Sequence, residues 1–203
     1  MQTYMLKWTV VLMVALITAG VGVWGPVALA AAKKVKPVAP IPQTGQTLSY
    51  ADGDDGDIQA GMAWPVPRFT DNLDGTVTDN LTGLIWLKPA NCSTISPADW
   101  LTALAHANGL AHGQCGLTDG SHLGDWRIPS IKELQSLVDL GQFSPAIPSG
   151  HPFLGVQPEN CWSSTTYAGF PENAAWNVYL QSGYTAGLVK SGAYLVWPVR
   201  GGN

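Results

Sequence analysis

Closely spaced aspartates are the residues of this sequence whose types and spacing most directly suggest chemistry. They form two groups, one in an acidic stretch and one around an Asp-Gly turn: Asp52, Asp54 and Asp57, and Asp71, Asp74 and Asp79. Calcium is bound by several oxygen ligands, which carboxylate-rich loops supply. Each group is therefore a candidate calcium site, although nothing in the sequence requires a cofactor.

Each group also has a simpler interpretation that needs no metal. Gly56 occupies the fifth position of a loop starting at Asp52, and no glutamate closes that loop, so the EF-hand pattern is not met. Charge runs are commonly solvated, and Asp and Gly are typical turn formers. We favour a solvated linker for the first group and turn formation for the second, with calcium binding as the alternative.

Residues 1–30 have the pattern of a secretory signal peptide. Lys7 precedes an apolar run over residues 8–17, and Ala28-Leu29-Ala30 provides a cleavage site of small residues. The alternative is an uncleaved membrane anchor, because the apolar stretch approaches the length that spans a bilayer. We expect a secreted, periplasmic or cell-surface protein that contacts a membrane only through this N-terminal segment.

Export to an oxidising compartment favours disulfide bonds. Cys92 and Cys115 lie 23 residues apart in a loop-rich region, and we expect them to pair. Cys161 then remains alone at the head of a predicted strand, where a cysteine is more often a small buried residue than a nucleophile. The sequence contains no Gly-x-Ser-x-Gly or His-Glu-x-x-His motif, and we expect no enzymatic activity.

Composition indicates one folded domain with an N-terminal extension. The 203 residues include 12% charged residues, carry a formal net charge of −4 and contain nine tryptophans. Such an apolar, aromatic composition argues against intrinsic disorder, and an acidic chain lacks the Lys/Arg surface that binds nucleic acid. We place a Pro/Lys-rich and then acidic linker at residues 31–61 and the domain at residues 62–203.

Hydrophobic patterning predicts an α+β domain in which two helices pack on short antiparallel strands. The expected strands are residues 68–70, 76–78, 84–87, 162–167, 176–180, 184–190 and 194–200. Because strands occur at both ends of the domain, we expect the N- and C-terminal strands to pair.

Two helices are expected between these groups of strands. Ser96 can cap the first, which Gly109 or Gly113 would end. Ser130 and Glu133 form the capping box of the second, which Gly141 would end.

One motif resembles a functional site, but we interpret it as structural. It is Asp125-Trp126-Arg127-Ile128-Pro129, which precedes Glu133. We expect Trp126 to be buried and Arg127 to pair with a carboxylate, as partly buried arginines commonly do. Four tryptophans on apolar faces are expected in the core: Trp86, Trp100, Trp162 and Trp176.

Several motifs follow one another in order along residues 42–203. They are Thr44-Gly45-Gln46-Thr47, Gly53-Asp54-Asp55-Gly56, Asp74-Gly75-Thr76-Val77-Thr78-Asp79, Gln114-Cys115-Gly116, Trp126-Arg127-Ile128-Pro129, Trp162-Ser163-Ser164-Thr165-Thr166 and Trp197-Pro198-Val199-Arg200-Gly201. In these motifs the sequence resembles the Legionella collagen-like (Lcl) C-terminal domain family, long described as a domain of unknown function. The resemblance implies a C-type-lectin-like fold and an exported, disulfide-bonded binding module; one family member is an adhesin for sulfated glycosaminoglycans.

We therefore expect a non-enzymatic binding or adhesion module that recognises a glycan or a surface polymer. The alternatives are a structural or assembly protein of the cell envelope without a small ligand, and an oxidase similar to the sulfatase-modifying enzymes of related fold. Sulfate recognition would need a local basic cluster. From Trp64 onward, however, six Lys and Arg residues are scattered among ten Asp and Glu residues.

Overall fold

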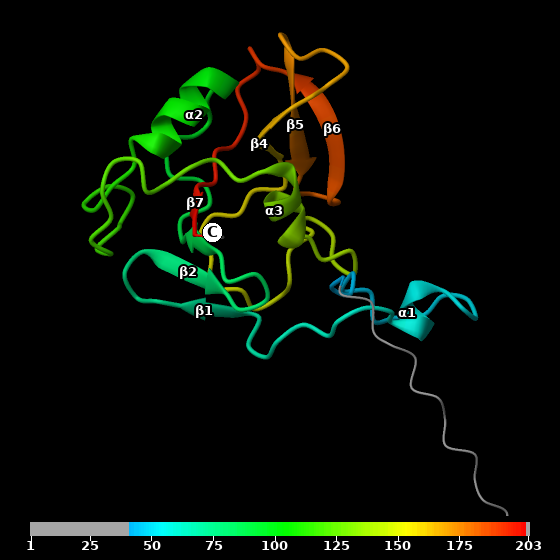
Figure 1. The fold of residues 1–203 in the computed structure, drawn as a ribbon. Helices are drawn as coiled ribbons and strands as arrows, with labels where there is room; N and C mark the ends of the chain where they lie inside the picture. Colours follow the sequence, from blue (N-terminus) through cyan, green and yellow to red (C-terminus); the bar gives the residue numbers. More distant parts are fainter. Residues whose placement is uncertain (1–40, 202–203) are drawn as a thin grey trace, which may run out of the picture. The chain divides into compact units, whose positions relative to one another are not determined.

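The computed structural model describes residues 41–201, which form two antiparallel sheets and three helices (Figure 1). The elements are α1 (Asp55–Ile58), β1 (Phe69–Asp71), β2 (Thr76–Asp79), β3 (Ile85–Leu87), α2 (Trp100–Asn108), α3 (Ile131–Ser136), β4 (Asn160–Thr166), β5 (Ala174–Tyr179), β6 (Tyr184–Val189) and β7 (Val199–Arg200). The predicted signal peptide and residues 31–40 of the predicted linker lie outside the described residues. None of the helices described is long and apolar enough to cross a membrane.

The first sheet has the strand order β1-β2-β3-β7. The predicted hairpin is confirmed, with Phe69 opposite Asp79. Gly75 in its turn has a φ of +86°, and an added Cβ would lie 2.4 Å from the Gly116 carbonyl oxygen, so only glycine fits there. β7 pairs with β3, so the two ends of the domain join through the third strand and not the first.

The second sheet has the order β4-β5-β6, and β5 and β6 form the predicted hairpin. Tyr179 and Tyr184 close its turn, and Trp176 lies opposite Gly187. β6 is an edge strand of this sheet.

The sequence predicted α3 more accurately than α2 at their N-termini. Ser130 and Glu133 form the expected capping box of α3. Asp99, however, caps α2, and not Ser96. The Ser96 hydroxyl instead accepts a hydrogen bond from the Val196 amide, and Ala98 pairs in an extended conformation with Tyr194, which delays the helix.

The C-terminus of α3 also differs from the prediction. The helix ends at Ser136, five residues before Gly141. Beyond it, the Asp139 amide donates to Ala146 and the Leu140 amide donates to Thr44. Because these tertiary hydrogen bonds replace helical ones, the helix stops at Ser136. The apolar residues 137 and 138 still pack inward after it.

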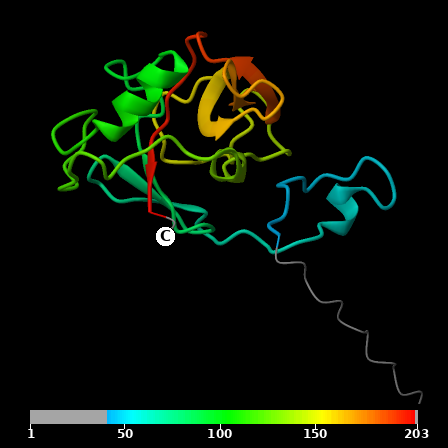
Figure 2. The same ribbon diagram turned by 45° about the horizontal axis from the view of Figure 1, so that its top comes forward.

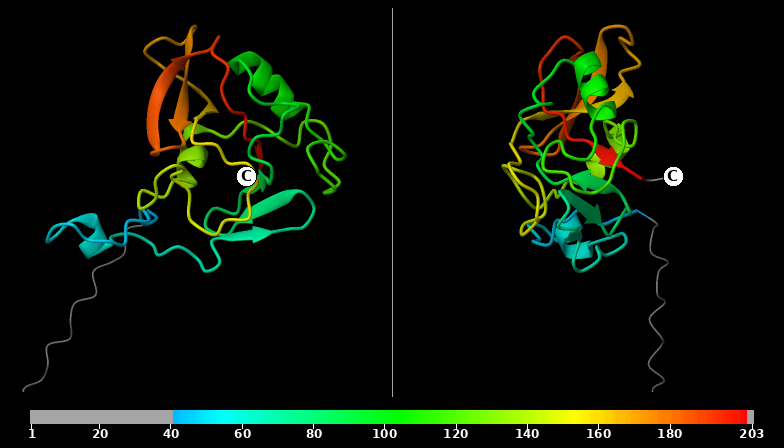
Figure 3. Two further views of the ribbon diagram at one scale, coloured as in Figure 1. Left: turned by 180° about the vertical axis from the view of Figure 1, so that it is seen from behind. Right: turned by 90° about the vertical axis from the view of Figure 1, so that its left-hand side faces the viewer.

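The C-terminal segment, residues 194–200, was predicted as one strand, but only β7 is regular. Isolated bridges connect Tyr194 to Ala98, Leu195 to Cys161 and Val199 to Arg127. The segment runs between α2 and the second sheet before it reaches the first sheet (Figures 1 and 3). It therefore contacts both sheets and the residues that precede α2.

The start of residues 41–61, which we predicted as linker, contacts the rest of the domain. Pro42 bridges to Met62, and the Leu140 amide donates to the Thr44 carbonyl. The short helix α1 lies within the acidic stretch (Figure 2).

Tryptophans dominate the core that joins the two sheets. Trp86, Trp126, Trp162 and Trp197 are fully buried, and the rings of Trp86 and Trp197 meet edge to face at 5.7 Å between centroids. Trp176 contradicts the prediction, because it is only half-buried. Its cross-strand neighbour is Gly187, which has no side chain to cover the indole ring.

The predicted disulfide joins Cys92 to Cys115 and leaves Cys161 as a buried thiol. The Cys92→Ser/Cys115→Ser double variant should lose about 3 kcal/mol of unfolding free energy, which corresponds to a Tm lower by roughly 6–12 °C. Thermal unfolding followed by circular dichroism measures this loss. Reductant should lower the Tm of the parent chain and not that of the double variant. Equal Tm values for the parent chain and the double variant without reductant would contradict a stabilising role of the disulfide.

Candidate functional site

The first group of candidate calcium ligands forms local turn and cap interactions. The Asp54 carboxylate accepts hydrogen bonds from the amides of Tyr50, Ala51 and Asp57 and caps α1. The bonds from Tyr50 and Asp57 are the main cause that holds the pKa of Asp54 below its usual range. Asp57 accepts from the Gly53 amide, and Asp52 is exposed.

The aspartates of the second group also make hydrogen bonds or ion pairs within the protein, but one of them, Asp79, is buried. The Asp71 carboxylate pairs with Lys88 at 2.6 Å, and this contact lowers the pKa of Asp71. Asp74 accepts from the amide and hydroxyl of Thr76 within the hairpin turn. The Asp79 side chain is completely buried.

Asp79 connects the first sheet to the end of α3 through Arg68. Arg68 donates to both Asp79 carboxylate oxygens, at 2.7 and 3.0 Å, and to the Ser136 carbonyl oxygen. Asp79 also accepts from the Leu81 amide and the Thr82 hydroxyl. Across residues 41–201, no three His, Cys, Asp or Glu side chains form a group that could hold a metal ion. Five of the six aspartates are engaged in turn, cap or ion-pair contacts, and Asp52 is exposed.

The Asp125–Pro129 motif has the structural role that we expected. Arg127 forms two hydrogen bonds with Glu133, at 2.7 and 2.6 Å, and Asp125 accepts from the His122 amide. The Pro129 carbonyl oxygen accepts from the Ser164 amide in β4. The motif thus connects α3 to both sheets.

Cys161 and Trp162 are both inaccessible in β4. Burial raises the pKa of the Cys161 thiol to about 12, so a thiolate is strongly disfavoured there at neutral pH. The Trp162 indole nitrogen donates to the Ala98 carbonyl oxygen at 3.0 Å. Both residues therefore belong to the core.

One feature of the structure was not predicted from the sequence. It is a shallow hollow of about 690 Å³, lined largely by aromatic residues, on β5 and β6. We call it the aromatic depression and define it by four aromatic lining residues: Tyr167, Phe170, Trp176 and Tyr184. Phe170 is 66% exposed and Tyr184 is 65% exposed. The sequence patterning gave no signal for it, because the exposure of Trp176 depends on the hairpin register, which places a glycine opposite it.

The depression is shaped by packing between its own rings. The Tyr167 ring meets Trp176 edge to face, with 4.9 Å between centroids. It also lies against Gly187, where an added Cβ would come within 2.8 Å of Tyr167 Cγ. Asn173 and Thr185 complete the polar part of the lining, and within residues 41–201 no hydrogen bond engages either side chain. The surface thus offers fixed aromatic faces beside uncharged polar groups.

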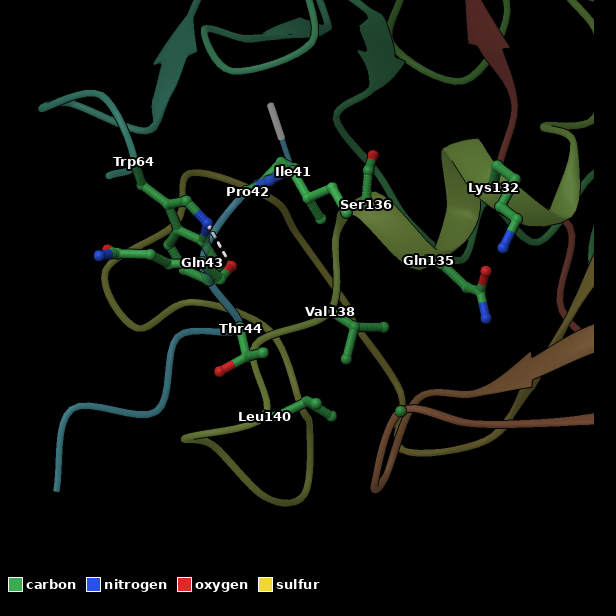
Figure 4. Close-up of a pocket in the computed structure, with 11 residues that line it drawn as sticks. Ile41, Pro42, Gln43, Thr44, Trp64, Lys132, Gln135, Ser136, Val138 and Leu140 are labelled. Atoms are coloured by element: carbon green, nitrogen blue, oxygen red, sulfur yellow. Dashed lines mark hydrogen bonds between the residues drawn. The ribbon is translucent and has the colours of Figure 1, made fainter. Parts of the chain in front are cut away.

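A second groove, of about 400 Å³, lies between the segment at residues 41–44 and the end of α3 (Figure 4). Its single aromatic lining residue is Trp64, whose indole nitrogen donates to the Gln43 carbonyl oxygen at 2.9 Å. Lys132 and Gln135 line it from α3. The groove therefore has less aromatic surface than the aromatic depression, and it contains a cation.

Comparison with known proteins identifies the family. The Lcl C-terminal domain profile matches residues 75–200, from the turn of the first hairpin to β7. The chain belongs to the Lcl C-terminal domain family. No curated protein matches the chain. The match covers every strand except β1, together with the disulfide and the aromatic depression of this Lcl C-terminal domain.

Removing the charge of Asp79 should destabilise the domain severely. Asp79→Asn leaves the buried Arg68 guanidinium unpaired, which costs about 3–5 kcal/mol of unfolding free energy. Urea unfolding measures the loss. The matched control is Asp71→Asn, which breaks a more exposed pair with Lys88 and should cost much less. Equal losses for the two variants would show that burial of the Arg68–Asp79 pair is unimportant.

Glu133 should make the stability depend on acid pH. Desolvation acts to raise its pKa, but hydrogen bonds from Arg127 and Ser130 outweigh it and bring the pKa below the usual 4.5. The contribution of Glu133 to the unfolding free energy is therefore complete above its unfolded-state pKa. It is lost as the pH falls through the lower folded-state pKa. In Glu133→Gln, the unfolding free energy should change less steeply between about pH 5 and about pH 3. Identical slopes in both proteins would contradict this role.

Proposed function

We propose that the chain is an exported, non-enzymatic binding module that recognises a glycan or another surface polymer through the aromatic depression. The observation that carries the proposal is the cluster of partly exposed rings on β5 and β6. Binding sites commonly combine aromatic surface with a few uncharged polar groups. The apolar face of a sugar ring stacks on such rings, while its hydroxyls reach neighbouring amides and hydroxyls.

The cysteines and the fold support the same proposal. The Cys92–Cys115 disulfide is typical of exported proteins. The buried Cys161 thiol, with its raised pKa, favours a core role over the oxidase alternative. Two antiparallel sheets, with β7 paired to β3 in the first and with α2 and α3 beside them, support a C-type-lectin-like fold.

A structural or assembly role in the cell envelope is the second candidate function. The edge strand β6 favours it, because Tyr184 and Val189 on this strand are exposed and edge strands can pair with another chain. This role predicts a stable protein complex and no saccharide ligand.

Loss of exposed rings from the depression should abolish recognition. Phe170→Ala and Tyr184→Ala should each weaken binding to a glycan array by about tenfold or more, the effect typical of central aromatic contacts. Phe143→Ala and Tyr50→Ala remove rings that are 71% and 79% exposed outside the depression and should bind like the parent chain.

The array is scanned with calcium and again with EDTA. Binding that survives EDTA and depends on Phe170 and Tyr184 supports the aromatic depression. Binding that EDTA abolishes would contradict metal-free recognition and point to the aspartate groups. No binding in either condition, with a stable partner in pull-down, would replace glycan recognition by the assembly role.

A further inference from the structure

We propose that the aromatic depression selects uncharged saccharides and disfavours sulfated and other polyanionic glycans. This inference rests on the proposed function, because it names the class of ligand for the same site. It follows from where the charged side chains of the described residues are and what they contact.

The cations of residues 41–201 are largely committed to internal contacts. Four of the six are in ion pairs with carboxylates: Arg68–Asp79, Lys88–Asp71, Arg127–Glu133 and Arg200–Asp119. A cation paired in this way has little charge left to offer a sulfate group, which is recognised by charge-assisted hydrogen bonds.

The other two cations do not line the depression either. Lys190 donates to the Pro171 carbonyl oxygen and lies 4.1 Å from the centroid of the Trp100 ring. Lys132, in α3, lines the second groove. The residues that line the depression include no Lys or Arg.

The net negative charge of residues 41–201 disfavours the binding of a polyanion. Residues 41–201 contain six Lys and Arg residues and fourteen Asp and Glu residues. Exposed Glu172 directly precedes Asn173 and Lys190 directly follows Val189, so one charge of each sign borders the lining and the excess negative charge is that of the folded part as a whole. A surface with excess negative charge repels a sulfated chain and slows its approach.

The depression itself fits an uncharged sugar ring. An aromatic face carries partial negative charge, which attracts the weakly positive C–H groups of a pyranose. Packing of Tyr167 against Trp176 and Gly187 holds these two rings in place before binding, so little of their conformational entropy is lost. Asn173 and Thr185 can exchange hydrogen bonds with sugar hydroxyls.

The test measures binding of the full chain to cello-, chito- and galacto-oligosaccharides and to heparin by titration calorimetry. At least one neutral oligosaccharide should bind, and its Kd should change less than about twofold between about 0.05 and about 0.5 M NaCl, because salt screens only charge interactions. The Phe170→Ala/Tyr184→Ala variant should lose this binding, whereas Phe143→Ala/Tyr50→Ala should keep it.

A triple variant removes three of the four basic residues that precede residue 41. Lys33, Lys34 and Lys36 lie outside the described residues, and Lys33→Gln/Lys34→Gln/Lys36→Gln neutralises them. Heparin binding that disappears in this variant supports the inference. Heparin binding that persists there and is lost in Phe170→Ala/Tyr184→Ala would overturn the inference but leave glycan recognition intact. Absence of all saccharide binding would overturn both proposals.

Discussion

The domain depends on one segment, residues 194–200, which hydrogen-bonds to both sheets and to the entry of α2. Leu195 accepts from the Trp162 amide in β4, and Val199 exchanges hydrogen bonds with Arg127. The buried Trp197 indole donates to the Leu87 carbonyl oxygen in β3. Because the two sheets share this segment and its tryptophan core, the position of the β5–β6 hairpin is fixed relative to the rest of the domain.

Charged and aromatic residues have separate roles in this Lcl C-terminal domain. Ion pairs such as Arg68–Asp79 and Arg127–Glu133 connect elements of the fold. Of the aspartates that suggested calcium, Asp54 caps α1 and Asp74 shapes a turn. The rings and uncharged side chains of the aromatic depression remain available for a ligand, as do Lys132 and Gln135 in the second groove. This division is the physical basis of our proposal that the domain recognises its ligand by stacking and not by charge.

Caps and turns that depend on neighbouring residues could be predicted from the sequence. Features that depend on contacts between residues far apart in the chain could not. The Ser130–Glu133 capping box and the turn at Gly75 need only nearby residues, and both are confirmed. Ser96 failed as a cap because Val196, far along the chain, uses its hydroxyl. Likewise, the half-exposed state of Trp176 depends on its partner across the hairpin and not on its own periodicity.

The most direct test of the central claim follows the indole N–H signals of the nine tryptophans by NMR during titration with the neutral oligosaccharide that binds best. Trp176 lines the aromatic depression and Trp64 lines the second groove, so their signals report on the two sites separately. The account predicts that the Trp176 signal shifts in a saturable manner while the Trp64 signal stays in place. A saturable shift of Trp64 with an unchanged Trp176 would contradict it.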